Sequence, residues 1–74
     1  MEVTVNLYSS LRKGNEPFEK VQLQQGGNVT DLLRELNIEL SEVEVVVVNG
    51  SLSQFDTQLN SQDQVVLIPF VSGG

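Results

Sequence analysis

The stretch GGNVTDLLRELNIEL, residues 26–40, decides the fold because the hydrophobic pattern changes its period there. Before it, apolar residues alternate with polar ones as in a strand, and within it they recur every three or four positions as in a helix. Four of them would share one helix face: Val29, Leu32, Leu33 and Leu36. Asn28 can cap the first turn, with Asp31 as its capping-box partner. We therefore predict one short helix over residues 28–36, ended by Asn37 in a left-handed conformation.

Two segments before the helix have the pattern of strands. Residues 2–8 (EVTVNLY) alternate apolar and polar side chains strictly. Residues 18–24 (FEKVQLQ) place Val21 and Leu23 on one face. The segment between them, residues 9–17, is rich in turn-forming residues. We expect these two strands to form a hairpin.

Two further strands follow the helix. Residues 42–50 (EVEVVVVNG) are the most apolar and end on the strong turn signal Asn-Gly, and residues 64–70 (QVVLIPF) come last. Three apolar residues between them are spaced to fill the core from an irregular segment: Leu52, Phe55 and Leu59. The order strand, strand, helix, strand, strand predicts an α+β fold, with a mixed sheet of four to five strands and one main helix packed on one face. We expect a single domain over residues 1–74.

The last two strands raise a problem, because one helix can cover only one face of the sheet. Residues 45–48 and 65–68 would be apolar on both faces. Either loops shield the second face, or that face is an apolar patch that docks a partner. The sequence leaves both alternatives open.

The composition excludes several kinds of chemistry. The 74 residues include no cysteine and no histidine, which excludes disulfides, structural zinc on these ligands, thiolate nucleophiles and Ser-His or Cys-His pairs. The carboxylates lack the spacing of a calcium loop. Since no nucleophile, base or metal site is evident, we expect a carrier or binding protein rather than an enzyme.

The net charge of −6 bears on the kind of partner. Nucleic acid is bound mainly through basic groups, so this chain is expected to repel it. Five carboxylates form a solvated face or else steer a basic protein partner: Asp31, Glu35, Glu39, Glu42 and Glu44. The sequence shows neither a signal peptide nor an apolar run long enough to span a bilayer, so we expect a cytoplasmic protein without membrane association.

The C-terminal residues form an unusual ending for an apolar strand. Pro69 cannot donate to a sheet ladder, so it marks where the strand leaves the sheet. Residues 71–74 would then be a short flexible tail that spans at most about 14 Å. Glycine fits a narrow passage in a partner enzyme because it has no side chain and accepts many backbone conformations. The carboxylate of Gly74 must be activated before it can react, typically as an acyl-adenylate.

The segments VVLIPFVSGG (residues 65–74) and VNGSLSQFDTQL (residues 48–59) resemble the small ubiquitin-like sulfur carriers of the β-grasp fold. NVTDLLREL (residues 28–36) is similar to the start of that family's helix. The resemblance extends to the molybdopterin synthase type and to the thiamine type of sulfur carrier. It is greatest to the small subunit of molybdopterin synthase. It spans essentially the whole chain and is most specific at Gly73-Gly74. It implies a ubiquitin-like β-grasp fold.

The resemblance also implies a role for the C-terminal residues. A ubiquitin-activating-like adenylyltransferase would use ATP to adenylate Gly74, and sulfur transfer would then leave a thiocarboxylate. The tail would insert into the larger catalytic subunit through three further residues: Val71, Ser72 and Gly73. Pro69 and Phe70 would contact that partner. The carrier itself would bind no cofactor and no metal.

Two positions depart from the family pattern. Pro69-Phe70 replaces a common Pro-Pro, and Gln62-Asp63 replaces a Gly-Asp turn. Because Phe70 lies where partners contact the carrier, the identity of the partner stays open. The alternatives are a related carrier for tRNA thiolation, thiamine or cysteine synthesis, a ubiquitin-like protein modifier, and a non-catalytic β-grasp binding module.

Overall fold

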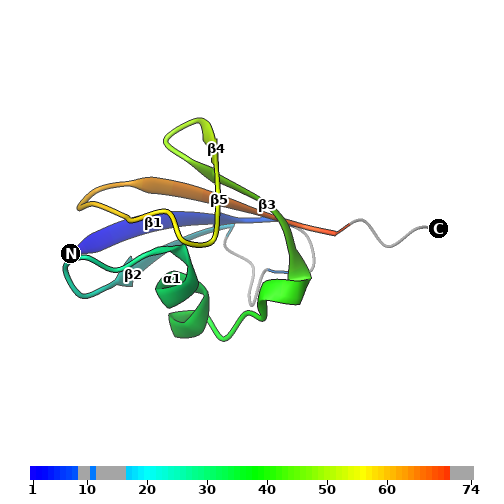
Figure 1. Ribbon diagram of the computed structural model, residues 1–74, viewed down its shortest axis with the longest axis horizontal. Coiled ribbons are helices and arrows are strands. Elements are labelled where there is room, and N and C mark those ends of the chain that lie inside the picture. Colours follow the sequence, from blue (N-terminus) through cyan, green and yellow to red (C-terminus); the bar gives the residue numbers. More distant parts are fainter. Residues whose placement is uncertain (9–10, 12–16, 71–74) are drawn as a thin grey trace.

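The computed structural model describes residues 1–8, 11 and 17–70 (Figure 1). The elements are β1 (Glu2–Leu7), β2 (Phe18–Gln22), α1 (Val29–Glu35), a short 3₁₀ helix (Leu40–Glu42), β3 (Val43–Val48), β4 (Ser51–Ser53) and β5 (Gln64–Pro69). The tail expected over residues 71–74 lies outside the described residues.

The strands form one mixed sheet in the order β2-β1-β5-β3-β4. β1 and β5 are parallel, and the other neighbours are antiparallel. Helix α1 lies across one face of this sheet (Figure 1). The mixed sheet of four to five strands with one helix on one face is therefore confirmed, and its central strand is the last one in the chain.

Helix α1 begins and ends where the sequence predicts. The Asn28 side chain accepts a hydrogen bond from the Asp31 backbone N–H, and the Asp31 carboxylate accepts one from the Asn28 N–H, each at 3.0 Å. At the other end Asn37 has φ of 58°, and the Ile38 N–H donates to the Leu33 carbonyl at 2.9 Å, as in a Schellman motif. The predicted capping box and left-handed terminator are confirmed.

A β-bulge changes which residues of β3 face the core. Its register against β5 is irregular between Val43 and Val45, so Glu44 is an extra residue in the strand. The insertion returns Val43 to the buried side, where Val46 also lies, and leaves Glu44 exposed. Without it, strict alternation from Val46 would direct Glu44 into the core.

The segment after β3 corrects one core prediction. Asn49 and Gly50 both have positive φ, as in the tight turn that joins two paired strands. The chain then continues as β4, which places Leu52 opposite Val47 on the face away from α1, with 80% of its surface exposed. Leu52 therefore does not fill the core. Phe55 does pack against the core, and Leu59 is buried within it.

A polar link joins this turn to the start of β5. The Asn49 side chain donates to the Asp63 carboxylate and accepts from the Gln64 N–H, both at 2.9 Å. The second Asp63 oxygen accepts from the Asn60 N–H, so this buried carboxylate is hydrogen-bonded. Gln62 has φ of 72°, a left-handed conformation that suits the glycine common in the family at this position.

Leu52 and Leu59 should respond differently to truncation to alanine. Leu59→Ala removes a buried side chain and is expected to lower the free energy of unfolding by about 2–5 kcal/mol. Leu52→Ala should change it by less than about 0.5 kcal/mol, since the side chain is largely exposed. Urea unfolding of both variants measures the difference. Equal losses would show that Leu52 belongs to the core after all.

Candidate functional site

The C-terminal end of β5 is the point where the chain leaves the sheet. Pro69 pairs with Val43 and is the last residue of the strand. Pro69 is buried, whereas Phe70 directly after it keeps 55% of its surface exposed. Of the two residues predicted to contact a partner, Phe70 is thus the one that presents its side chain at the surface.

The other predicted site residues lie outside the described part of the chain: Val71, Ser72, Gly73 and Gly74. Figure 1 shows that β5 ends at the opposite end of the molecule from the N-terminus. β5 is paired with β1 as far as Leu67 and with β3 as far as Pro69, so the point where the chain leaves the sheet is held by β3.

The face of the sheet away from α1 carries an aliphatic patch. In the register of the sheet, Val45 lies opposite Ile68, and Val47 lies between Val66 and Leu52. We call these five residues the apolar face. All except the largely exposed Leu52 are partly exposed. By the alternation of β5, Phe70 follows on the same side as Val66 and Ile68.

The loop after β4 packs on the opposite side, against the helix. The Thr30 backbone and hydroxyl groups donate to the Phe55 carbonyl at 3.0 and 2.9 Å. The Leu59 N–H donates to the Gly27 carbonyl at 2.9 Å. Among the described residues this loop therefore serves the core, and the apolar face keeps part of its surface exposed. That arrangement favours the partner-docking alternative.

The charges are placed unevenly around this patch. On the strands of the same face, the described residues contribute Glu2 and Lys20, on β1 and β2. Two exposed acids, Glu39 and Glu42, precede β3, and the exposed Glu44 lies in its bulge, next to the point where β5 ends. A partner that covers this end of the sheet would meet an apolar centre beside negative charge.

Two kinds of feature are absent from the described residues. Within residues 1–8, 11 and 17–70, no group of three or more acidic side chains is placed to hold a metal ion. None of the helices in the same part of the chain has the length and apolar character needed to cross a bilayer.

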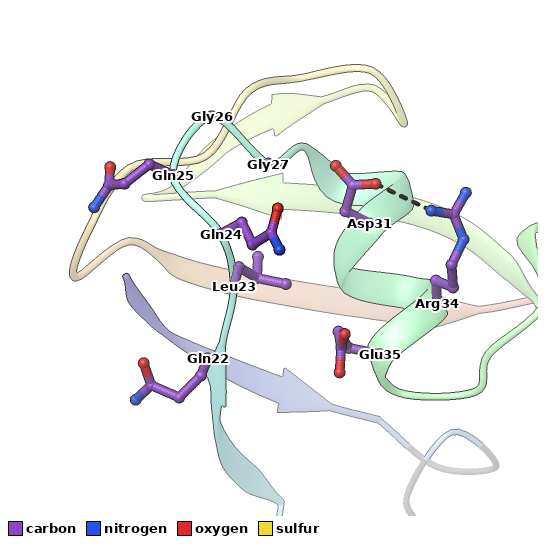
Figure 2. A pocket seen from close by; sticks show the side chains of 9 residues that line it. All are labelled: Gln22, Leu23, Gln24, Gln25, Gly26, Gly27, Asp31, Arg34 and Glu35. Carbon is purple, nitrogen blue, oxygen red and sulfur yellow. Dashed lines mark hydrogen bonds and ion pairs between the residues drawn. The ribbon is translucent and has the colours of Figure 1, made fainter.

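A hollow lies between the β2–α1 connection and the helix (Figure 2). Leu23, Gln24 and Glu35 are directed into it, whereas Gln22 and Gln25 point away. Asp31 and Arg34 form an ion pair at 3.3 Å on the helix side. No sequence pattern predicts this hollow, because it forms between the β2–α1 connection and the helix that follows it.

Two further features were missed in the sequence. Leu11 lies in the predicted loop but is only 2% exposed, and a lone leucine among turn residues is a weak signal. The position of Leu52 could have been predicted, because a two-residue Asn-Gly turn fixes the register and places Leu52 opposite Val47.

The fold matches known structures over nearly their whole length. SAMP1 from Haloferax volcanii superposes with a TM-score of 0.81 at 21% identity, with both chains covered completely. A putative molybdopterin converting factor subunit 1 from Pyrococcus furiosus gives 0.75 at 25% identity, covering 95% of this chain and 98% of that one.

A third similar structure contains a partner. It is the complex of subunits 1 and 2 of the molybdopterin-converting factor from Helicobacter pylori, with a TM-score of 0.64, 22% identity and complete coverage of both chains. No curated protein is detectably similar to this chain in sequence.

These structures confirm the ubiquitin-like β-grasp fold that the resemblance implied. The family profile described as ThiS matches residues 5–74, from the middle of β1 to the final glycine. The chain therefore belongs to the ThiS family, the small ubiquitin-like sulfur carriers that its sequence resembles.

Proposed function

We propose that this protein carries sulfur as a thiocarboxylate on Gly74 and serves as the small subunit of a molybdopterin-converting enzyme. The observation that supports this most is the position of the sheet's end: the ladder of β5 stops at Pro69, and the family match continues to Gly74. In this proposal, the residues that follow the last paired residue of β5 carry the reactive terminus rather than extend the sheet.

The proposed chemistry has two steps that balance. First, a Gly74 carboxylate oxygen attacks the α-phosphorus of ATP, and pyrophosphate leaves. Second, a hydrosulfide-level donor attacks the carbonyl carbon, and AMP leaves with the former carboxylate oxygen and one proton is released. The adenylyltransferase supplies the catalytic groups for both steps. The carrier supplies an unhindered terminus, because glycine places no side chain beside the carbonyl.

The catalytic subunit is proposed from the two molybdopterin-converting factor structures. One of them shows subunit 1 in complex with subunit 2, and the other is the 25% identical protein from Pyrococcus furiosus. In this chain, the apolar face and Phe70 would lie against the larger subunit while the tail enters it. The partner would present basic groups toward the acids that precede β3.

The size of the face explains why the tail is needed as well. The whole side of the sheet away from α1, of which the apolar face is a part, measures at most roughly 480 Å², taking five strands about 4.8 Å apart and six residues of about 3.3 Å each. A standard interface buries about 800 Å² on each partner. The face alone is therefore small, and insertion of the residues after Pro69 would add the missing contact area.

The attachment of sulfur can be measured by intact mass. The full chain, incubated with its adenylyltransferase, ATP and hydrosulfide, is expected to gain about 16 Da, the mass difference between sulfur and oxygen. Fragmentation should place this change on Gly74, and a variant that lacks Gly74 should show none. An unchanged mass, while the same enzyme activates another carrier, would contradict the sulfur-carrier function. Linkage of Gly74 to lysines of other proteins would instead support the modifier function.

The docking surface can be tested with two phenylalanines of similar exposure. Phe70→Ala should weaken binding to the catalytic subunit at least about fivefold, as for an aromatic anchor. It should lower the free energy of unfolding by less than about 1 kcal/mol, well under the 3–5 kcal/mol typical of a buried phenylalanine.

Phe18→Ala is the matched control. Phe18 is 59% exposed and is separated from the apolar face by Asn6 in the sheet register. Its truncation should change binding less than about twofold, within the range of a peripheral contact. Calorimetry with the catalytic subunit measures both variants, and equal effects would move the interface away from β5.

A further inference from the structure

The two lateral edges of the sheet are built differently. At one edge β4 has only three residues, and the neighbouring β3 carries the bulge and the exposed Glu44. Short edge strands, bulges and charges all hinder the addition of another strand. At the other edge β2 pairs with β1 through five consecutive residues without irregularity. One edge is thus blunted and the other is regular.

The hydrogen bonds at the end of β2 determine which of its backbone N–H and C=O groups point away from β1. The Met1 ammonium group donates to the Leu23 carbonyl at 2.7 Å, and the Leu23 N–H donates to the Met1 carbonyl at 2.8 Å. Since these two residues exchange both bonds, alternation makes Val21 bond toward β1 as well. The N–H and C=O groups of Lys20 and Gln22 therefore point away from β1, along an edge that no described strand covers.

The hollow between the β2–α1 connection and α1, called the groove below, lies on the helix side at the Gln22 end of this edge. Its floor is the buried Leu23, and Glu35 of α1 is directed into it (Figure 2). Asp31 and Arg34 on the same helix neutralise each other in their ion pair, so that among the described residues no ion pair balances the charge of Glu35. A long basic side chain would lay its aliphatic part on the apolar floor and bring its cation to this carboxylate.

The opposite side of the same edge carries an exposed aromatic side chain. Phe18 opens β2 on the face away from α1 and is largely exposed. An added strand would alternate its side chains between this side and the groove. The two environments therefore select apolar and basic side chains in alternation.

We propose that the outer edge of β2 binds an extended segment of a protein partner in which basic and apolar residues alternate. The backbone of that segment would bond to Lys20 and Gln22, its basic side chains would enter the groove toward Glu35, and its apolar ones would pack beside Phe18. This surface lies on the edge strand farthest from β4 and does not involve Gly74. The proposal is therefore independent of the sulfur-carrier function and goes beyond it.

The probe is a capped heptapeptide of alternating lysine and valine, titrated into the ¹⁵N-labelled full chain. The Lys20 and Gln22 amides are expected to shift and to exchange more slowly with solvent. A glutamate–valine heptapeptide of the same length should bind at least about fivefold more weakly, because it places like charge beside Glu35. The lysine peptide N-methylated on alternate backbone nitrogens should lose binding, because it cannot complete the ladder.

Three variants separate the contributions. Lys20→Pro removes an outward N–H without removing a bond of the β1–β2 ladder, and it should abolish binding. Glu35→Gln should weaken binding about fivefold, as for one partly exposed ion pair. Glu44→Gln makes the same change of charge at the other edge and should leave binding unchanged. If Lys20→Pro does not fold, the N-methylated peptide and Glu35→Gln still decide the question.

Several results would overturn the proposal. These are equal binding of the two unmodified peptides, shifts confined to the apolar face, and an equal loss of affinity in Glu35→Gln and Glu44→Gln. Sedimentation of the free protein adds one more. A dimer whose formation protects the Lys20 and Gln22 amides would show that a second copy of this chain, not a basic segment, occupies the edge.

Discussion

The whole structure depends on the pairing of β5 with two strands at once. It lies parallel to β1 and antiparallel to β3. In the described sheet, β5 therefore connects the β1–β2 pair to the β3–β4 pair. Isolated two-stranded hairpins are marginal in water, and a sheet of five strands with a helix on one face is not. The same strand fixes the place where the chain leaves the sheet. One ladder therefore bears on both the stability of the fold and the position from which the proposed reactive terminus extends.

The surfaces around this ladder have separate roles. The face under α1 holds the core, the opposite face keeps a partly exposed aliphatic patch, and the two lateral edges differ in how open they are to pairing. The Glu44 bulge contributes to two of these roles, because it keeps a charge out of the core and also disturbs the edge beside β4. The described part of the protein therefore presents several distinct surfaces, although none of its acidic side chains are grouped to hold a metal ion.

Much of the fold could be predicted because its signals are local. The capping pair Asn28 and Asp31 and the terminator Asn37 act within a few residues, and the structure confirms all three. The strand order could not be derived from periodicity alone, since pairing of β1 with β5 joins segments about sixty residues apart. The core prediction for Leu52 is wrong because the Asn49-Gly50 turn imposes a register that places this apolar side chain on the exposed face. The role of Gly74 rests on the resemblance and the family match, and local chemistry supplies only a reason why glycine suits it.

The late position of the central strand has a consequence during synthesis. Until residues 64–69 have emerged from the ribosome, β1–β2 and β3–β4 are separate ribbons with no shared ladder, and α1 has no complete sheet to cover. A chain broken off before β5 would therefore remain unfolded and open to proteases. It would also lack Gly74, the proposed site of activation. Truncated translation products of such a protein would be removed rather than compete with the complete chain for its partners.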